Sequence, residues 1–174
     1  LEAMKMAQCS FVHGEFLVEY FQNVPKYLSH GVNTQFFYPK GVRNLQAPPK
    51  LLCVGHNGLL GTSQVFDRKG FSFAIKSAKW LGYEITILGA SPNNKKYFEE
   101  NPDLLEYDKL NIIYDATELE LREAYHSHDI LIHASMIEAG HPPLTPLEAM
   151  SVGLPVIGTA MGLDVPSVVV ERDV

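Results

Sequence analysis

The sequence predicts an α/β domain: a Rossmann-like, mainly parallel sheet with helices on both faces. Short apolar runs recur along the chain, most of them ended by a turn residue, and helical patterns lie between them. Strands and helices in alternation indicate βαβ units with right-handed crossovers. The chain has 174 residues, 46% of them hydrophobic, which suits one domain of ordinary size with a buried core.

Six apolar runs are predicted to be strands. Each is short, unbroken and rich in Ile, Leu and Val, which is typical of strands buried on both faces of a parallel sheet. They are Leu51–Val54, Ile85–Leu88, Leu110–Tyr114, Ile130–Ile132, Pro155–Ile157 and Val168–Val170.

The clearest helix is predicted after the first of these strands. Between Phe71 and Leu81 the apolar residues fall at helical spacing, and Gly82 follows as a stop. Residues 93–101 show a weaker helical pattern.

Two further helices are predicted from capping boxes, in which a Ser or Thr precedes a Glu by three residues. Thr117 with Glu120 begins a helix that runs to about Ser127. Thr145 with Glu148 begins a second one, with proline at its first helical position and a glycine at its end.

The first part of the chain has a different pattern. Cys9–His13 and Lys26–Ser29 resemble strands, and Glu15–Gln22 resembles an amphipathic helix. We expect residues 1–25 to be the remnant of a preceding N-terminal domain, and residues 26–174 to form the Rossmann-like domain, truncated at its C-terminus.

Charge and composition exclude several classes of protein. Lys and Arg number 14 against 20 Asp and Glu, a formal net charge of −6, which argues against a nucleic-acid partner. No apolar run reaches the roughly 18 residues of a membrane span. Cys9 and Cys53 do not make a disulfide scaffold, which favours a cytoplasmic protein. The histidines from His126 to His141 lack metal-ligand spacing, so we expect no metal.

Ligands of an open parallel sheet bind beyond the carboxyl ends of its strands. Gly55, Gly58 and Gly61 follow the first strand, but the helical pattern begins only at Phe71, so no helix N-terminus is expected beside this glycine cluster. The next strand ends in Gly89 rather than near an acidic residue. A dinucleotide site is therefore not predicted.

A second segment favours a phosphate ligand. Residues 138–148 leave a strand and enter a helix N-terminus, where free backbone N–H groups suit an anion. Arg68 and Lys69 precede the long helix at another strand-to-helix junction, and such cations would neutralise a diphosphate.

These segments resemble the C-terminal, nucleotide-sugar-binding half of a GT-B glycosyltransferase, most closely the retaining enzymes of glycosyltransferase family 4. The matching pieces are His30–Asn33 with Phe37 and Pro39, Leu51–Gly55 with Lys69-Gly70, Ile85–Gly89, and Ser135–Glu138 continuing into Leu147–Val156. The last block is the most specific.

The resemblance implies a role for each matching residue. Lys69 would contact the donor diphosphate and stabilise the leaving group, and Glu138 would hold the donor sugar. Glu148 would hold the nucleotide ribose. Gly140 and His141 would offer backbone contacts to the phosphates or the sugar. The remaining donor-binding candidates are Gly55, His56, Arg68 and Thr145.

The chain departs from the family pattern at two places. His56 stands where the family usually has Arg, and histidine is a weaker, pH-dependent partner for phosphate. Nine residues separate Glu138 and Glu148, more than the family's usual spacing, so the pocket around the sugar should be reshaped. Glu148 could also serve only as a helix cap, and His133 could line the cleft or only pack there.

The resemblance implies a retaining, hexosyltransferase-type glycosyltransferase. It would use a UDP- or GDP-sugar without a metal or other cofactor, and pass the sugar to a glycan or lipid-linked acceptor held mostly by a missing N-terminal domain. We expect this chain alone to transfer nothing, and the full-length protein to associate with membranes at most peripherally. The alternatives are a GT-B-like nucleotide-sugar epimerase and a non-catalytic binding module.

Overall fold

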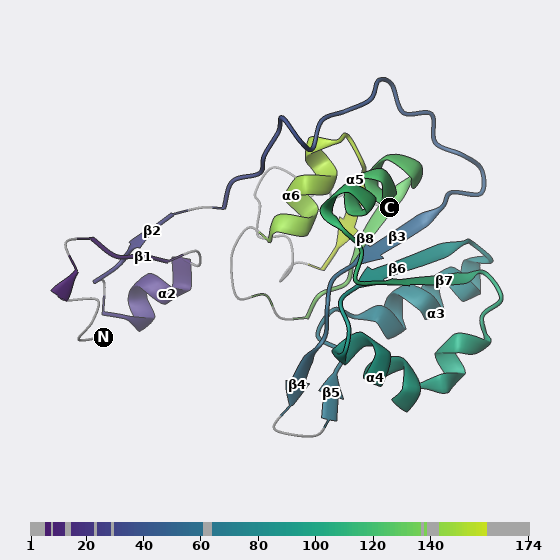
Figure 1. Ribbon diagram of the computed structural model, residues 1–174, viewed down its shortest axis with the longest axis horizontal. Helices are drawn as coiled ribbons and strands as arrows, with labels where there is room; N and C mark the ends of the chain where they lie inside the picture. The colour runs from purple at the N-terminus through teal and green to yellow at the C-terminus, as the bar shows by residue number, and fades with distance from the viewer. Residues whose placement is uncertain are drawn as a thin grey trace, which may run out of the picture.

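The computed structural model describes residues 6–7, 9–12, 15–22, 24–28, 30–60, 64–136, 138 and 143–159. Its centre is a five-stranded, fully parallel sheet of order β7-β6-β3-β8-β9 (Figure 1). The strands are β3 (Leu51–Val54), β6 (Ile85–Gly89), β7 (Leu110–Tyr114), β8 (Ile130–His133) and β9 (Val156–Gly158). The predicted fold class is confirmed, and the strand predicted at 168–170 lies outside the described residues.

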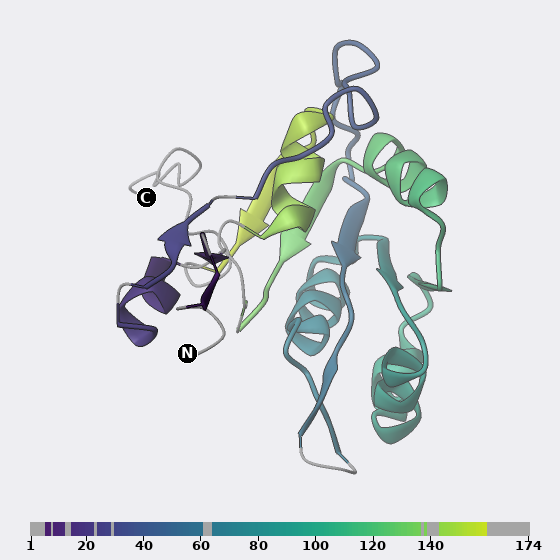
Figure 2. The same cartoon turned by 60° about the vertical axis from the view of Figure 1, so that its left-hand side comes forward.

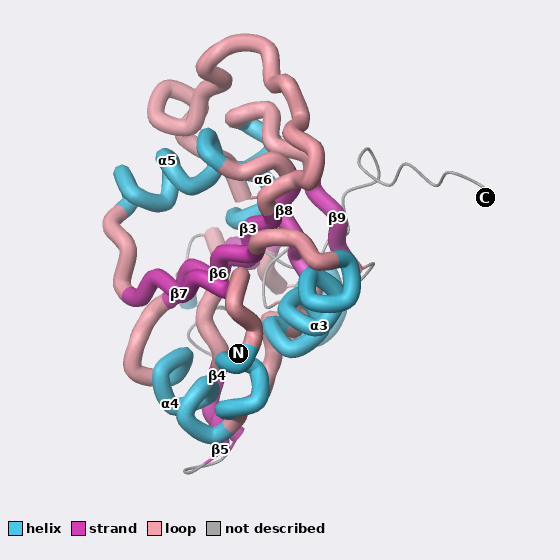
Figure 3. Tube along the Cα trace, turned by 90° about the vertical axis from the view of Figure 1, so that its right-hand side faces the viewer, coloured by secondary structure: helices cyan, strands magenta, loops and turns pink. Residues whose placement is uncertain are grey.

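Helices cover both faces of this sheet. On one face lie α3 (Phe71–Leu81) and α4 (Asn93–Glu100), and on the other lie α5 (Glu118–Ser127) and α6 (Leu144–Ser151). Figure 3 shows the two helix layers on opposite sides of the strands. A 3-10 helix, η1 (Pro102–Glu106), follows α4.

Two apolar cores result from the alternation of side chains along each strand. In β3, Leu51 and Cys53 pack toward α3 and α4, whereas Leu52 and Val54 pack toward α5 and α6. Phe37, 3% exposed, comes from the segment before β3 and joins the second core beside Tyr125.

Predicted local signals set one end of α3 and one end of α5. Gly82 ends α3 in the left-handed conformation, and its N–H is bonded to the carbonyls of the last turn. Thr117 and Glu120 form the complete capping box of α5. The structure therefore confirms both signals.

The structure contains one hairpin that the sequence patterns did not predict. Strands β4 (Gly58–Leu60) and β5 (Gln64–Phe66) pair antiparallel between β3 and α3. They extend past the carboxyl end of β3 (Figure 2). The hairpin returns the chain to the sheet edge, so that α3 begins beside the point where β3 ends.

A small unit of β1 (Phe11–Val12), α2 (Glu15–Tyr20) and β2 (Lys26–Tyr27) precedes the α/β domain. Its two strands pair parallel with each other, not with the main sheet. Figure 1 shows the unit to one side of the sheet. Across the described residues, no helix has both the length and the apolar character that crossing a membrane requires.

Candidate functional site

The candidate site lies where the strand order reverses, between the carboxyl ends of β3 and β8. In doubly wound sheets this switch point forms the ligand crevice. The segment before α3 crosses it: the Arg68 carbonyl accepts bonds from the Met136 N–H (2.9 Å) and the Ser135 hydroxyl (3.2 Å) beyond β8. Two distant parts of the sequence are thus held together at one edge of the sheet.

Glycines allow the close approach of these segments. A Cβ added to Gly55 would lie 2.8 Å from the Lys69 side chain, and one added to Gly70 would lie 2.3 Å from the carbonyl oxygen of Ala134. Gly70 also has φ of +67°, which favours glycine. The expectation that no helix N-terminus meets the glycine cluster is therefore wrong, because the unpredicted hairpin brings the start of α3 back to Gly55.

Asp67 and Asn57 fix the backbone of this crossing segment. The Asp67 carboxylate accepts the N–H groups of Phe71 and Ser72, both at 2.9 Å, and so caps α3. The fully buried Asn57 accepts the Lys69 N–H at 3.1 Å and donates to Asp67 at 3.4 Å. Neither residue was predicted to belong to the site, although an Asp shortly before a helix is a recognisable capping signal.

Three side chains, those of Lys69, Arg68 and His133, meet at the Glu138 carboxylate. Lys69 Nζ donates to Glu138 Oε1, Arg68 Nη1 lies 3.2 Å from Oε2, and His133 Nε2 lies 3.3 Å from Oε1. The side chains of Lys69 and Glu138 are each 9% exposed. The structure thus brings together Arg68, Lys69 and Glu138, and it adds His133, which lines the site.

Burial and neighbours shift the pKa values of this cluster. Burial lowers the pKa of Lys69, and the bond and charge of Glu138 only partly oppose this. Burial raises the pKa of Glu138, but the contacts with His133, Lys69 and Ser135 and the charge of Lys69 outweigh it, so the pKa lies well below its ordinary value. Glu138 is therefore an ionised counter-ion to two cations.

His56 presents its backbone to this cluster. Its carbonyl accepts a bond from Arg68 Nη2 at 3.0 Å, while its ring is exposed. Burial lowers the pKa of His56, with smaller contributions from the charges of Arg68 and Lys69. A lowered pKa favours the neutral ring, so the cations beside this backbone are Arg68 and Lys69 rather than His56.

The structure corrects the prediction for Thr145 and Glu148. Helix α6 begins at Leu144 with Pro143 as its N-cap, and no side chain caps it. Glu148 Oε2 instead accepts the Tyr125 hydroxyl of α5 at 2.9 Å, and Thr145 also contacts that hydroxyl. The prediction that Thr145 and Glu148 form a capping box is therefore wrong, because both side chains contact the Tyr125 hydroxyl of α5 instead.

Burial also sets the pKa of Glu148. It raises this pKa, Tyr125 partly opposes the effect, and the charge of Glu118 adds to it. Within the described part of the chain, no hydrogen bond or ion pair joins Glu148 to the Glu138 cluster. Gly140 and His141 lie outside the described residues.

A cavity of about 190 Å³ adjoins the cluster at the carboxyl ends of β3, β6 and β7. Gly55 and His56 line one side, and Asp115 and Ala116 line the other. Asp115 accepts the Ser91 N–H at 2.7 Å and the Ser91 hydroxyl, which lower the pKa of the carboxyl group. The cavity shares Gly55 and His56 with the surroundings of the cluster, and it has the Asp115 carboxylate at its far end.

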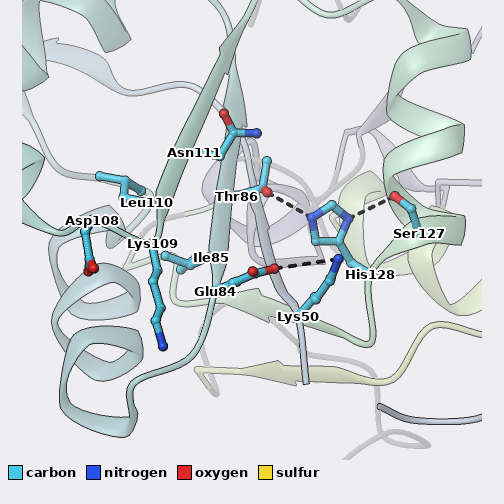
Figure 4. Close-up of a pocket in the computed structure, with 10 residues that line it drawn as sticks. All are labelled: Lys50, Glu84, Ile85, Thr86, Asp108, Lys109, Leu110, Asn111, Ser127 and His128. Atoms are coloured by element: carbon cyan, nitrogen blue, oxygen red, sulfur yellow. Dashed lines mark hydrogen bonds and ion pairs between the residues drawn. The ribbon is translucent and has the colours of Figure 1, made fainter. Parts of the chain in front are cut away.

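A larger hollow of about 450 Å³ lies at the opposite, amino-terminal edge of the sheet (Figure 4). Three of its charged groups already have partners: Lys50 lies 3.6 Å from Glu84, and Lys109 donates to the Gly82 carbonyl. His128 is bonded to Thr86 at 2.9 Å. This hollow contains none of the residues expected to bind the donor. Nowhere among the described residues do three or more His, Cys, Asp or Glu side chains form a possible metal site.

Residues 50–173 match the family described as glycosyl transferases group 1. Because this match spans well over half of the chain, the chain belongs to that family. A comparison with curated protein sequences finds no match.

Solved structures with the same fold include glycosyltransferases. The catalytic domain of starch synthase IV from Arabidopsis thaliana, bound to ADP and acarbose, is similar at a TM-score of 0.70 and 16% identity, over 98% of this chain and 43% of that one. The C-terminal domain of the group 1 protein LpcC from Francisella tularensis is similar at a TM-score of 0.56 and 25% identity, over 81% of this chain and 76% of that one. Anabaena HepE, in complex with UDP and glucose, is similar at a TM-score of 0.62 and 14% identity, over 90% of this chain and 45% of that one. The chain thus spans less than half of the first and third of these proteins.

Proposed function

We propose that this chain is the donor-binding domain of a retaining hexosyltransferase that uses a nucleotide-diphospho-sugar. The observation that carries the proposal is the convergence of Lys69 and Arg68 on one buried point beside Gly55, at the switch point of the sheet. Two cations at this place suit a diphosphate, which can accept several charge-assisted hydrogen bonds at once. The resemblance to glycosyltransferase family 4 supports retention of the sugar's configuration.

In this proposal the diphosphate binds over Gly55. Without a side chain, Gly55 lets an anion approach the backbone, and Lys69 and Arg68 neutralise it. The first N–H groups of α6, which begins at Leu144, have no partner within the helix, and such groups suit phosphate oxygens. The preceding residues Gly140 and His141 remain candidates for backbone contacts.

The two glutamates would hold the rest of the donor. Glu138, beside Lys69, would accept hydrogen bonds from hydroxyls of the sugar. Glu148 would accept bonds from the ribose, and its carboxylate has sites left beyond the single bond from Tyr125. The 190 Å³ cavity between Gly55 and Asp115 is the place proposed for the base.

The proposed chemistry is electrostatic and positional. As the bond between sugar and diphosphate breaks, negative charge grows on the leaving phosphate, and the prearranged Lys69 and Arg68 stabilise it. This arrangement fits a UDP- or GDP-sugar transferase that needs no metal or other cofactor. HepE, solved with UDP and glucose, and the starch synthase, solved with ADP, support a nucleotide donor.

The acceptor and the location of the protein are also proposals. We propose a glycan or lipid-linked acceptor, bound mainly by a second, N-terminal domain, in a cytoplasmic enzyme with at most peripheral membrane contact. The coverage of under half of the starch synthase and HepE structures is consistent with a site shared between two domains.

Calorimetric titration with UDP, GDP and ADP tests the proposal directly. We expect one of them to bind measurably, and more tightly than inorganic diphosphate, because the base and ribose add contacts. Binding of none of the three would contradict the proposed function. Equal binding of inorganic diphosphate would reduce the site to a general anion site.

A further inference from the structure

His133 contacts the buried carboxylate of the site at Oε1, the same oxygen that accepts the bond from Lys69. His133 is the last residue of β8 and is 2% exposed, and its Nε2 lies 3.3 Å from Glu138 Oε1. This distance is at the long limit for a hydrogen bond, and Nε2 makes none of good geometry within the described residues. A small movement of Glu138 toward His133 would close the bond.

Binding of a diphosphate creates a need for such a partner. Lys69 and Arg68 are both engaged by Glu138, so an arriving diphosphate competes for them and repels the carboxylate. A carboxylate that is only 9% exposed cannot turn to water without opening the site. It needs another hydrogen-bond donor nearby.

The neighbouring Ser135 is a poorer candidate for this task. Its hydroxyl also contacts Glu138, but it donates to the Arg68 carbonyl at 3.2 Å, and a hydroxyl has only one proton to give. His133 can offer Nε2–H without breaking a bond. It also comes from a central strand, which holds its position firmly.

We propose that His133 is a positioning residue, which receives Glu138 when the diphosphate takes Lys69 and Arg68 and so keeps the carboxylate directed at the donor sugar. The inference rests on the proposed function, because it needs a diphosphate at the two cations. Without His133, Glu138 would stay on Lys69 and oppose binding.

A double-mutant cycle on nucleoside diphosphate affinity tests this inference. In the otherwise wild-type chain we expect His133→Leu to weaken binding of whichever of UDP, GDP or ADP binds by roughly five-fold, an interaction of about 1 kcal/mol. His133→Gln, which keeps an N–H donor, should restore most of the affinity. With Glu138→Gln already in place, affinity should rise and His133→Leu should have no further effect.

The control is His126→Leu, which removes a histidine of α5 that contacts the Tyr38 carbonyl and no residue of the site; it should leave affinity unchanged. Thermal unfolding of each variant checks that it is folded. Equal weakening by His133→Leu in both backgrounds would show a merely structural role and overturn the inference, as would no weakening in the wild-type background. If the wild-type chain binds none of the three nucleotides, the proposed function itself fails, and that result is visible before any variant is made.

Discussion

Lys69 is a cation whose burial has an energetic cost. It lies just before the N-terminus of α3, where the helix dipole disfavours positive charge, and burial lowers its pKa. Its partner Glu138 offsets these effects only in part. A residue held at such a place against local preference is typical of a functional site.

Replacement of Lys69 tests its place in the donor site. Lys69→Ala should weaken nucleoside diphosphate binding roughly ten-fold or more, the value of one charge-assisted hydrogen bond. Calorimetry measures the change. Lys76→Ala is the matched control, because Lys76 lies exposed on the same helix and should bind like the wild type. An unchanged affinity in Lys69→Ala would remove this residue from the site.

The two glutamates should affect stability with opposite pH dependence. The pKa of Glu138 lies below its ordinary value, so its stabilising effect is present above that ordinary value and is lost as pH falls toward the folded-state pKa. The pKa of Glu148 is raised, so its ionisation destabilises the fold as pH rises through the raised value.

Denaturant unfolding of two isosteric variants measures this contrast. At pH 7, Glu138→Gln should lower the free energy of unfolding by about 2 kcal/mol, because it leaves buried Lys69 without a counter-ion. Glu148→Gln should be neutral or stabilising, since it removes a buried charge but can still accept the Tyr125 hydroxyl bond. At acid pH both differences should shrink. If Glu148→Gln lost as much stability at pH 7 as Glu138→Gln, the proposed contrast would be wrong.

At the scale of elements, the two ends of α3 offer a natural comparison. Gly70 before the helix and Gly82 after it both have left-handed backbones, with φ of +67° and +72°. Beside Gly82 a Cβ would meet nothing within 4 Å, whereas beside Gly70 it would overlap the Ala134 carbonyl. Gly70 therefore also allows the start of α3 to pack closely against the end of β8.

Replacing each glycine by alanine separates the energetic cost of the left-handed backbone from the cost of the steric overlap. Gly82→Ala should cost about 1 kcal/mol in the free energy of unfolding, the cost of a left-handed alanine. Gly70→Ala should cost roughly 2 kcal/mol more, because the overlap forces α3 and β8 apart. Denaturant titration of both variants measures the difference. Equal costs would mean that the segment before α3 can shift away from β8 at little energetic cost, and that Gly70 is not needed for this contact.

For the molecule as a whole, the sheet was readily predicted from the sequence. All five strands follow predicted runs within about two residues, because strands buried on both faces must be continuously apolar. The β4–β5 hairpin was missed, because each of its strands has only three residues and shows no clear periodicity. That omission also hid the return of α3 to Gly55.

The site was predictable in residue type but not in its connections. Sequence motifs and resemblance indicated Lys69, Arg68 and Glu138, and the structure brings them into contact. No motif could show that Asn57 holds the Lys69 backbone, or that Tyr125 draws Glu148 away from a capping role. Such contacts join residues far apart in the chain, so they depend on the folded arrangement of the sheet.

The proposed donor site includes residues from both faces of the sheet. Lys69 precedes α3 on one face of the sheet, Glu148 belongs to α6 on the other, and Gly55 ends the central strand. A donor nucleotide that reaches all three would link the two apolar cores. It would bind only the folded chain, so its binding free energy adds to the free energy of unfolding.

Thermal unfolding with bound nucleotide therefore tests the site in the intact fold. At about 100 times its Kd, the best of UDP, GDP and ADP should add about 2.7 kcal/mol, which raises Tm by roughly 5–10 °C for a chain of this size. Lys76→Ala should retain the full shift, and Lys69→Ala should lose about half of it or more at the same nucleotide concentration. Inorganic diphosphate should give a smaller shift than the nucleotide, because it reaches the cations but neither Glu148 nor the cavity beside Asp115. An equal shift with diphosphate alone would mean that the ligand spans only the cation pair, and that the two cores are not linked through the site.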